Sequence, residues 1–459
     1  MVSKLFRTAS MALLLATSMS TIAQVTEYRL DNGLKVIVKE DHRAPVAVTQ
    51  VWYKVGSSYE PDGITGISHA LEHMMFKGTA SLGPGEFSKT ISALGGNDNA
   101  FTSRDYTAYF ETLSVDHLDK AFELEADRMR NLVLDADEFA NEIAVVREER
   151  RLRTEDKPSG KVYEQFNAVA WRSSPYQNPV IGWMNDLEQM TIDDLAAWYK
   201  RWYAPNNATL VVVGDVQPEA VLSLAKRHFG PLEGSEIDMP KPPAEPKQSG
   251  ETRVEVRVPA RQPYVLMGYK TPIVGQAQEP WEPYALYVLS NVLDGGNSAR
   301  LARELVRGKA IAASAGAQYD TYGRLPGMFL LSGTPTDQHT VADVEQALRA
   351  AVAQLREELV DPSELRRIVT QAIAGKVFQA DSLFYQAMEI GVLETIGLDW
   401  RLIEGEIDAI RAVTPEQVRS VAQRYLHDDN LTVATLDPLP MEQKKPRSAA
   451  IAIGGRHGS

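Results

Sequence analysis

Two histidines and a glutamate lie within five residues of one another in a chain that has only eight histidines. They are His69, Glu72 and His73, which form the pattern H-x-x-E-H within the stretch SHALEHMMFKGT. Residues four positions apart lie on one face of a helix, so the two imidazoles can bind one metal ion, and zinc is commonly bound by such nitrogen ligands. Glu72 would lie beside the metal and take a proton from a water there. The pattern therefore predicts a zinc site that activates water for hydrolysis.

The residues around this motif favour a packed helix. They read GISHALEHMMFKGT, an apolar stretch that includes Gly66 and Ser68 at its start, and they predict a helix packed against a sheet. Such support matters because a chain of this composition contains H-x-x-E-H by chance in roughly one case in a hundred. Two histidines that pack in the core or face solvent are the alternative interpretation.

A zinc site that keeps one position open for water needs a third protein ligand. The chain has no cysteine, so we expect this ligand to be acidic and to come from another helix. The segment DADEFANEIAVVREERRLRTED contains Glu142 and Glu149, which are two helical turns apart and share one face. We place Val145 and Val146 on that face too, and Glu148 elsewhere. Ordinary surface charges on a helix rich in Glu and Arg are the alternative.

The composition limits the class of protein. With 459 residues, of which 44% are hydrophobic and 24% are charged, the chain has the balance of a soluble globular protein with at least two domains. Its net charge of -13 argues against nucleic-acid binding, which depends on clustered Lys and Arg. The sequence contains no cysteine nucleophile, no G-x-S-x-G elbow and no phosphate-binding loop.

The N-terminus has the layout of an export signal. The stretch MVSKLFRTASMALLLATSMSTIAQ begins with Lys4 and Arg7, continues with an uncharged apolar core and ends in small residues at Ala23. A membrane anchor is the alternative, but the apolar core is too short to span a bilayer comfortably. The sequence therefore predicts a periplasmic protein without a membrane anchor, and secretion is the alternative location.

Two separated segments of the chain look alike. Thr191–Asp215 and Thr414–Asp437 align without a gap, and each predicts a threonine N-cap, a helix, a short turn and a β-branched strand. We therefore expect an α+β fold of two homologous modules, each a mostly antiparallel sheet with helices packed on one face. The predicted division is a signal peptide at 1–23, an N-terminal zinc-bearing module at 24–232, a linker at 233–251, a C-terminal module at 252–438 and a tail at 439–459.

The second module lacks the metal ligands of the first. Alignment of FKGT (76–79) with DGGN (294–297) places Tyr287, Ser290 and Asn291 at the positions of the three motif residues. None of these three types is a usual zinc ligand. We expect one zinc ion per chain.

These features resemble a known family. H-x-x-E-H followed by Glu149, 76 residues after His73 (149 minus 73), resembles the inverted-motif zinc peptidases, the group of pitrilysin, insulin-degrading enzyme and mitochondrial processing peptidase. The spacing is similar to the processing-peptidase-like branch, M16B. The resemblance covers nearly all of the mature chain and implies a metalloendopeptidase. It implies His69, His73 and Glu149 as zinc ligands, Glu72 as general base, and Glu142 as a residue that holds a ligand in place.

The resemblance also implies a peptide-binding strand. GGNDNAFTSRDYTAYF (95–110) is similar to the edge strand on which the family binds an extended substrate through main-chain hydrogen bonds. Transferred to this chain, the substrate-binding residues are Asn99, Ala100 and Phe101. A plain amphipathic hairpin is the alternative.

The chain departs from the family pattern in its second module. Active members carry a helix that ends like LREKRGLAYSV, but this chain has ARELVRGKAIAASAG, with Val306 and Ala313 at the Arg and Tyr positions. Arg307 is a candidate replacement for the Arg. Loss of one such donor typically lowers the rate by about 10²–10³.

The missing donors suggest a partner. In the resembling processing peptidases, a zinc subunit works with a companion subunit. We therefore predict a heterodimer whose companion lacks H-x-x-E-H but carries the Arg and Tyr, and a homodimer is the weaker alternative. Two other functions remain open, which are a non-catalytic scaffold or assembly subunit of the same family and a zinc hydrolase of another amide or ester.

Overall fold

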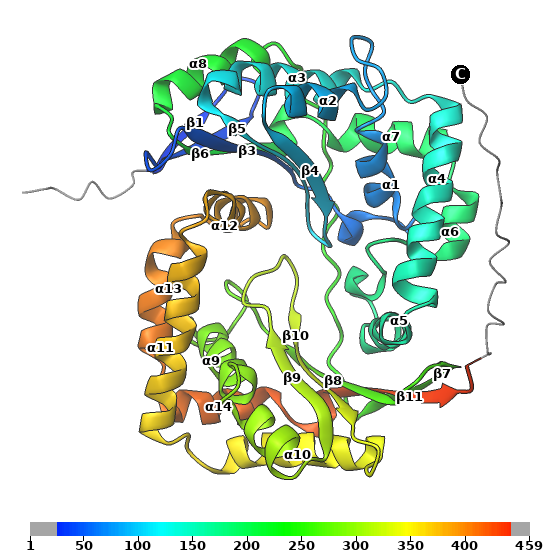
Figure 1. The fold of residues 1–459 in the computed structure, drawn as a ribbon, viewed down its shortest axis with the longest axis vertical. Coiled ribbons are helices and arrows are strands. Elements are labelled where there is room, and N and C mark those ends of the chain that lie inside the picture. Colours follow the sequence, from blue (N-terminus) through cyan, green and yellow to red (C-terminus); the bar gives the residue numbers. More distant parts are fainter. Residues whose placement is uncertain (1–24, 442–459) are drawn as a thin grey trace, which may run out of the picture.

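The computed structural model describes residues 25–441, and the chain in this range forms two sheets that face each other with helices around them (Figure 1). The predicted signal peptide and most of the predicted tail lie outside the described residues. Both sheets are mostly antiparallel, and each carries its own set of helices. The α+β fold of two similar modules is therefore confirmed.

The first sheet has six strands in the order β1-β2-β6-β3-β5-β4, and only β2 and β6 run parallel. It therefore has β1 at one edge and β4 at the other. Its strands are β1 (Val25–Arg29), β2 (Lys35–Glu40), β3 (Val46–Tyr53), β4 (Asn97–Thr102), β5 (Thr107–Ser114) and β6 (Ala208–Gly214).

The second sheet repeats this topology without an equivalent of β1. Its order is β7-β11-β8-β10-β9, and β11 and β7 are its parallel pair. The edge strand β9 therefore corresponds to β4. The strands are β7 (Thr252–Pro259), β8 (Tyr264–Thr271), β9 (Ala312–Tyr319), β10 (Gly327–Pro335) and β11 (Leu431–Leu439).

The helix–strand segments that look alike in the sequence occupy equivalent places. α7 (Ile192–Trp202) precedes β6, and α14 (Pro415–Tyr425) precedes β11. Each helix begins with a capping box, in which the side chain of Thr191 or Thr414 accepts a hydrogen bond from a backbone N–H three residues later. The predicted threonine N-caps are confirmed.

One face of each sheet packs against helices of its own module, as predicted. The helices of the first module are α1 (Ile67–Met74), α2 (Glu86–Ala93), α3 (Leu118–Asn131), α4 (Ala136–Arg150), α5 (Pro158–Ala170), α6 (Met184–Gln189), α7 and α8 (Pro218–His228). Those of the second module are α9 (Glu282–Asp294), α10 (Val341–Glu357), α11 (Pro362–Gln379), α12 (Leu383–Thr395), α13 (Leu402–Arg411) and α14.

The other face of each sheet is covered by a helix from the opposite module. α12 packs on β3 and β6 of the first sheet, and α5 packs on β7, β8 and β11 of the second sheet. Side chains alternate along β3, so Val51 contacts the first module's own core while Trp52 lies against α12. A Cβ at Gly391 would lie 2.0 Å from Trp52 Cε2, which shows how closely α12 approaches the sheet. The exchanged helices interlock the modules.

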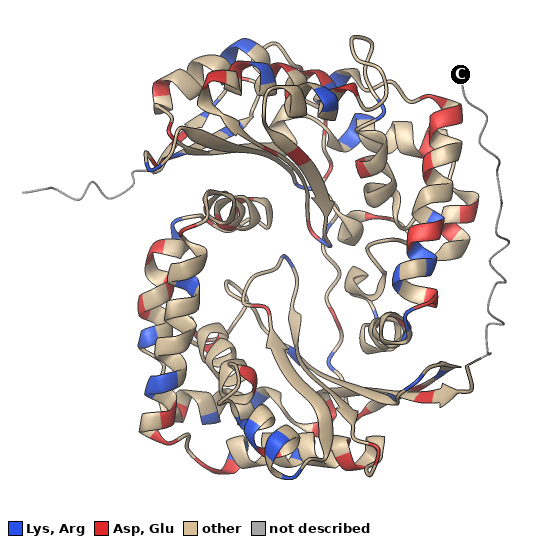
Figure 2. Cartoon of the chain, in the orientation of Figure 1, with Lys and Arg blue, Asp and Glu red and all other residues tan. Residues whose placement is uncertain are grey.

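Charged residues lie mostly on the helices, and the strands carry few of them (Figure 2). The helices carry both acidic and basic residues, so the negative net charge is spread over the molecule. Within residues 25–441, no helix combines the length and the apolar character needed to cross a membrane.

Candidate metal centre

The H-x-x-E-H motif lies on α1, a short helix that packs against α4 and β4. Ile67, Leu71 and Met74 enter the core of the first module and hold the helix in place. Glu60 accepts hydrogen bonds from the backbone N–H groups of Gly66 (2.6 Å) and Ser68 (2.8 Å), so its carboxylate caps the start of the helix. The remaining face presents the motif side chains toward α4 and β4.

Three potential ligand atoms converge between α1 and α4. Glu149 Oε2 lies 3.6 Å from His69 Nε2 and 3.5 Å from His73 Nε2. His69, His73 and Glu149 are the only group of three or more metal-ligating side chains found among residues 25–441. The structure thus brings together the three residues that the resemblance implied as ligands.

The spacing of these atoms fits a shared zinc ion. Zinc bonds of about 2.0–2.1 Å in a tetrahedral arrangement place two ligand atoms about 3.3 Å apart. Glu149 Oε2 is buried and has no hydrogen-bond partner in the part of the chain that the structure describes, and it is too far from either imidazole nitrogen for a good hydrogen bond. A buried carboxylate oxygen without a partner is costly, and a cation at this point would satisfy it.

Electrostatics keep the ligands ready for a metal. Burial, together with the nearby His73 and Arg153, lowers the pKa of His69 to about 3, so its imidazole is neutral at neutral pH. α4 continues into a π-helical turn, Arg151–Glu155, and Arg153 Nη2 lies 2.6 Å from Glu149 Oε1. Arg153 therefore holds one oxygen of Glu149 and leaves the other directed at the histidines.

Glu142 contacts His73 from behind. Its Oε2 lies 3.1 Å from His73 Nδ1, and its Oε1 lies 2.5 Å from Lys77 Nζ. Burial raises the pKa of Glu142, but the bonds from Lys77 and His73 outweigh it and hold this pKa below its usual value. A carboxylate here directs Nε2 of His73 toward Glu149, while Nδ1 of His69 is buried without a partner.

Glu72 receives a hydrogen bond from the edge strand of the first sheet. Thr102 Oγ1, at the end of β4, donates to Glu72 Oε2 over 2.6 Å. Burial raises the pKa of Glu72, and the Thr102 hydrogen bond and the charge of His73 oppose this effect. Thr102 is not among the site residues predicted from the sequence, although it directly follows Asn99, Ala100 and Phe101. The contact joins residues 30 positions apart on a helix and a strand, and no local pattern reports it.

The stretch predicted to contain a substrate-binding strand includes β4, and among residues 25–441 this strand pairs with β5 alone and has its other edge open. Asn99 uses its side-chain oxygen to accept a bond from the N–H of Ala100. Phe101 packs against Trp52, with ring centroids 5.4 Å apart. Its side chain is thus engaged in the protein.

The second module offers no comparable site at the equivalent helix. On α9, the side chains of Ser290 and Asn291 both donate to the carbonyl oxygen of Tyr287 in their own helix. Arg307, the candidate replacement for the family Arg, donates to the carbonyl oxygen of Asn297 within its own module.

Comparisons with known proteins agree with this arrangement. Residues 35–183 match the sequence profile described as Insulinase (Peptidase family M16), and residues 189–372 match the one described as Peptidase M16 inactive domain. The zinc protease PqqE of Helicobacter pylori is 34% identical over 417 residues, which cover 89% of this chain and 92% of that protein. The uncharacterized zinc protease YmxG of Bacillus subtilis is 25% identical and covers 90% of this chain and 98% of its own length.

Solved structures give the same result. A protease from Helicobacter pylori superposes with a TM-score of 0.86 at 32% identity and covers 91% of this chain and 100% of its own. The periplasmic protease PqqL of Escherichia coli superposes with a TM-score of 0.75 at 17% identity, over 90% of this chain and 48% of that one. This second likeness concerns the fold alone.

Proposed function

Because this chain belongs to peptidase family M16, we propose that it is a zinc-dependent endopeptidase that hydrolyses peptides with an activated water. The observation that carries the proposal is the convergence of His69, His73 and Glu149 beside Glu72, with one oxygen of Glu149 buried and unbonded. These three side chains would hold one zinc ion per chain. We assign the chain to the processing-peptidase-like branch on the motif spacing.

Held by His69, His73 and Glu149, a zinc ion would provide Lewis-acid chemistry for acidifying a water and polarising the scissile carbonyl. Glu72 accepts the proton of the attacking water at its carboxylate and passes it to the leaving amine. Thr102 holds one oxygen of Glu72 by its hydrogen bond, and the other oxygen would accept the proton. Glu142 holds the His73 ring in the orientation that a ligand needs.

We propose extended peptides as the substrates. The edge of β4 that faces away from β5 is open, so a peptide can add there as a further strand along Asn99, Ala100 and Phe101. A cavity of about 640 Å³ lies beyond the end of this strand, between the modules, and includes Ser103 and Tyr163 in its lining. The cavity supports a substrate that continues past the metal centre. A hydrolase of other amides or esters would not need it.

The chain is proposed to work as the zinc subunit of a heterodimer in the periplasm. The second module has Val306 and Ala313 where active relatives carry Arg and Tyr, and Arg307 is bonded within its own module. A companion that carries Arg and Tyr would complete the site, and a homodimer is the weaker alternative. The periplasmic assignment rests on the export signal in the sequence, with secretion as the alternative.

Peptide cleavage by the purified mature chain tests the proposed function. We expect cleavage that requires zinc, stops with a chelator, and rises when a related companion lacking H-x-x-E-H is added. Full activity that a companion leaves unchanged would contradict the heterodimer. The Glu72→Gln variant should bind one zinc per chain and lose cleavage, because it lacks the base but keeps the ligands.

A non-catalytic scaffold subunit is the second candidate, favoured by the absent Arg and Tyr. The same measurement separates the two functions. A scaffold would cleave no peptide with or without its companion, and Glu72→Gln would behave like the wild type in every assembly assay. Retention of Glu72 together with all three ligand side chains favours the peptidase, because a scaffold has no chemical use for the set.

A further inference from the structure

A loop of the second module reaches across to the first module and contacts a short helix and a turn there. It connects β9 and β10 and carries Arg324. Arg324 Nη2 donates to both the carbonyl oxygen and the hydroxyl of Ser58, each over 2.9 Å, and its guanidinium lies 4.0 Å from the ring centroid of Tyr59. Both contacts fall on the short 3-10 helix Ser57–Tyr59 of the first module.

The same loop holds the turn between β4 and β5. Asp105, which is buried in this turn, accepts the backbone N–H of Arg324 over 3.0 Å, and its carboxylate pairs with the guanidinium at 3.5 Å. It also accepts bonds from the hydroxyls of Ser58 (2.7 Å) and Tyr176. Every element at this contact therefore converges on one carboxylate, and Arg324 is its cationic partner.

The 3-10 helix transmits this contact to the edge strand. The backbone N–H groups of Ser57 and Ser58 donate to the carbonyl oxygens of Ser103 (3.2 Å) and Arg104 (2.7 Å) in the turn. A Cβ at Gly56 would lie 2.4 Å from the Ser103 oxygen, so only glycine permits this approach. The residue before the turn is the threonine that donates to the carboxylate of the general base.

The 3-10 helix also connects to the helix that carries the motif. Glu60 directly follows it, and its carboxylate accepts the N–H groups of Gly66 and Ser68 at the start of α1. Arg324 thus holds a short segment from which two routes lead to the proposed general base. One runs through the turn and Thr102, and the other through Glu60 and the start of α1.

We propose that Arg324 is a positioning residue, through which the second module fixes the peptide-binding strand and the general base of the first. Its catalytic consequence rests on the proposed peptidase function. Arg324 touches neither the ligand set nor Glu72 itself, so its effect passes through Asp105 and Ser58. In this chain, where Val306 and Ala313 replace the family Arg and Tyr, this contact gives the second module an influence on the active site.

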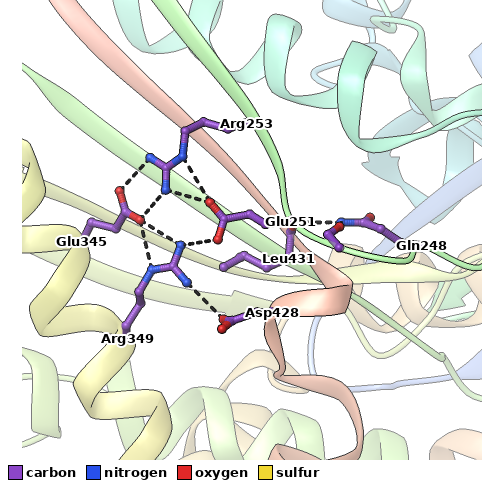
Figure 3. A network of polar contacts seen from close by, with 8 residues as sticks. Gln248, Glu251, Arg253, Glu345, Arg349, Asp428 and Leu431 are labelled. Carbon is purple, nitrogen blue, oxygen red and sulfur yellow. Dashed lines mark hydrogen bonds and ion pairs between the residues drawn. The ribbon is translucent and has the colours of Figure 1, made fainter.

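The test compares Arg324→Ala and Arg324→Lys with a matched control, Arg253→Ala. Arg253 pairs with Glu251 and Glu345 in a network with Arg349 that joins the second module to the end of the linker (Figure 3). Its removal therefore breaks several ion pairs without touching the contact between modules. The measurements, made on the full mature chain with zinc, are amide hydrogen exchange, zinc content and peptide cleavage.

We expect Arg324→Ala to raise amide exchange at 57–59 and 97–107 by about tenfold or more, as loss of a charge-assisted hydrogen bond predicts. Zinc content should stay at one per chain, and kcat/KM should fall about tenfold. Arg324→Lys keeps the charge but loses the planar set of N–H donors. Its amide exchange and its kcat/KM should lie between those of Arg324→Ala and the wild type. Arg253→Ala should leave amide exchange in both segments, and kcat/KM, unchanged.

Unchanged exchange at 97–107 in Arg324→Ala, or an equal increase in Arg253→Ala, would overturn the proposal. If Arg324→Ala does not fold, amide exchange at 57–59 and 97–107 in Arg324→Lys, compared with Arg253→Ala, tests the proposal instead. A wild-type chain that cleaves no peptide would contradict the proposed function, but the exchange measurement would still decide whether Arg324 fixes the strand.

Discussion

Removal of the Glu142 carboxylate should weaken zinc binding while the fold persists. Glu142 lies 3.1 Å from His73 Nδ1, and this contact directs the opposite nitrogen toward Glu149. In Glu142→Ala, the His73 ring loses the carboxylate that contacts Nδ1 and is freer to rotate. A hydrogen bond to a charged group contributes about 1.5–3 kcal/mol. Loss of a residue that orients a metal ligand typically lowers metal affinity about 10–100-fold, which is the same range.

The assay is competition for zinc between the chain and a chelator of known affinity, at one fixed pH near neutrality. Glu138→Ala is the matched control, because Glu138 lies on the same helix and pairs with the same Lys77 (3.7 Å) but has no contact with His73. Thermal unfolding of the metal-free variants checks that both fold. Zinc affinity within twofold of wild type in Glu142→Ala, or an equal loss in Glu138→Ala, would refute the reasoning.

Two further predictions concern the general base and the contact between modules. Thr102→Val removes a hydrogen bond that stabilises the charged form of Glu72, so the pKa of Glu72 should rise further and the acid limb of kcat/KM should move to higher pH. A limb that does not move would show that Thr102 has no influence on the base. Gly391→Ala places a methyl group against Trp52 and should lower stability by about 1–3 kcal/mol. At Gly375 in α11, an added Cβ would have no atom within 4 Å, so Gly375→Ala should raise stability by about 0.5–1 kcal/mol. Thermal unfolding that shifts in the same direction for both variants would contradict this expectation.

The sequence predicted those features that arise from local spacing. The i, i+4 histidines, the helix with Glu142 and Glu149, and the threonine N-caps each follow from a pattern of a few residues, and family membership followed from the motif and its spacing. The prediction that Val145 and Val146 share the buried face was half wrong. Val146 is buried but Val145 is 49% exposed, because successive residues on a helix point about 100° apart.

The features that the sequence did not reveal join distant elements. Exchange of α5 and α12 between the modules follows from two sheets that both need cover on their second face, and no periodicity states which helix supplies it. The bond between Thr102 and Glu72, and the contacts of Arg324 with Asp105 and Ser58, likewise depend on the assembled fold. Such tertiary contacts fix the positions of the site residues, whereas the identities of the metal ligands follow from local sequence patterns.

Anomalous diffraction at the zinc absorption edge, on crystals of the mature chain grown with zinc, tests the central claim most directly. We predict one strong peak per chain, about 2.0–2.2 Å from a nitrogen of His69, a nitrogen of His73 and an oxygen of Glu149. A peak at other side chains, or zinc in the crystal without a peak at these three, would contradict it.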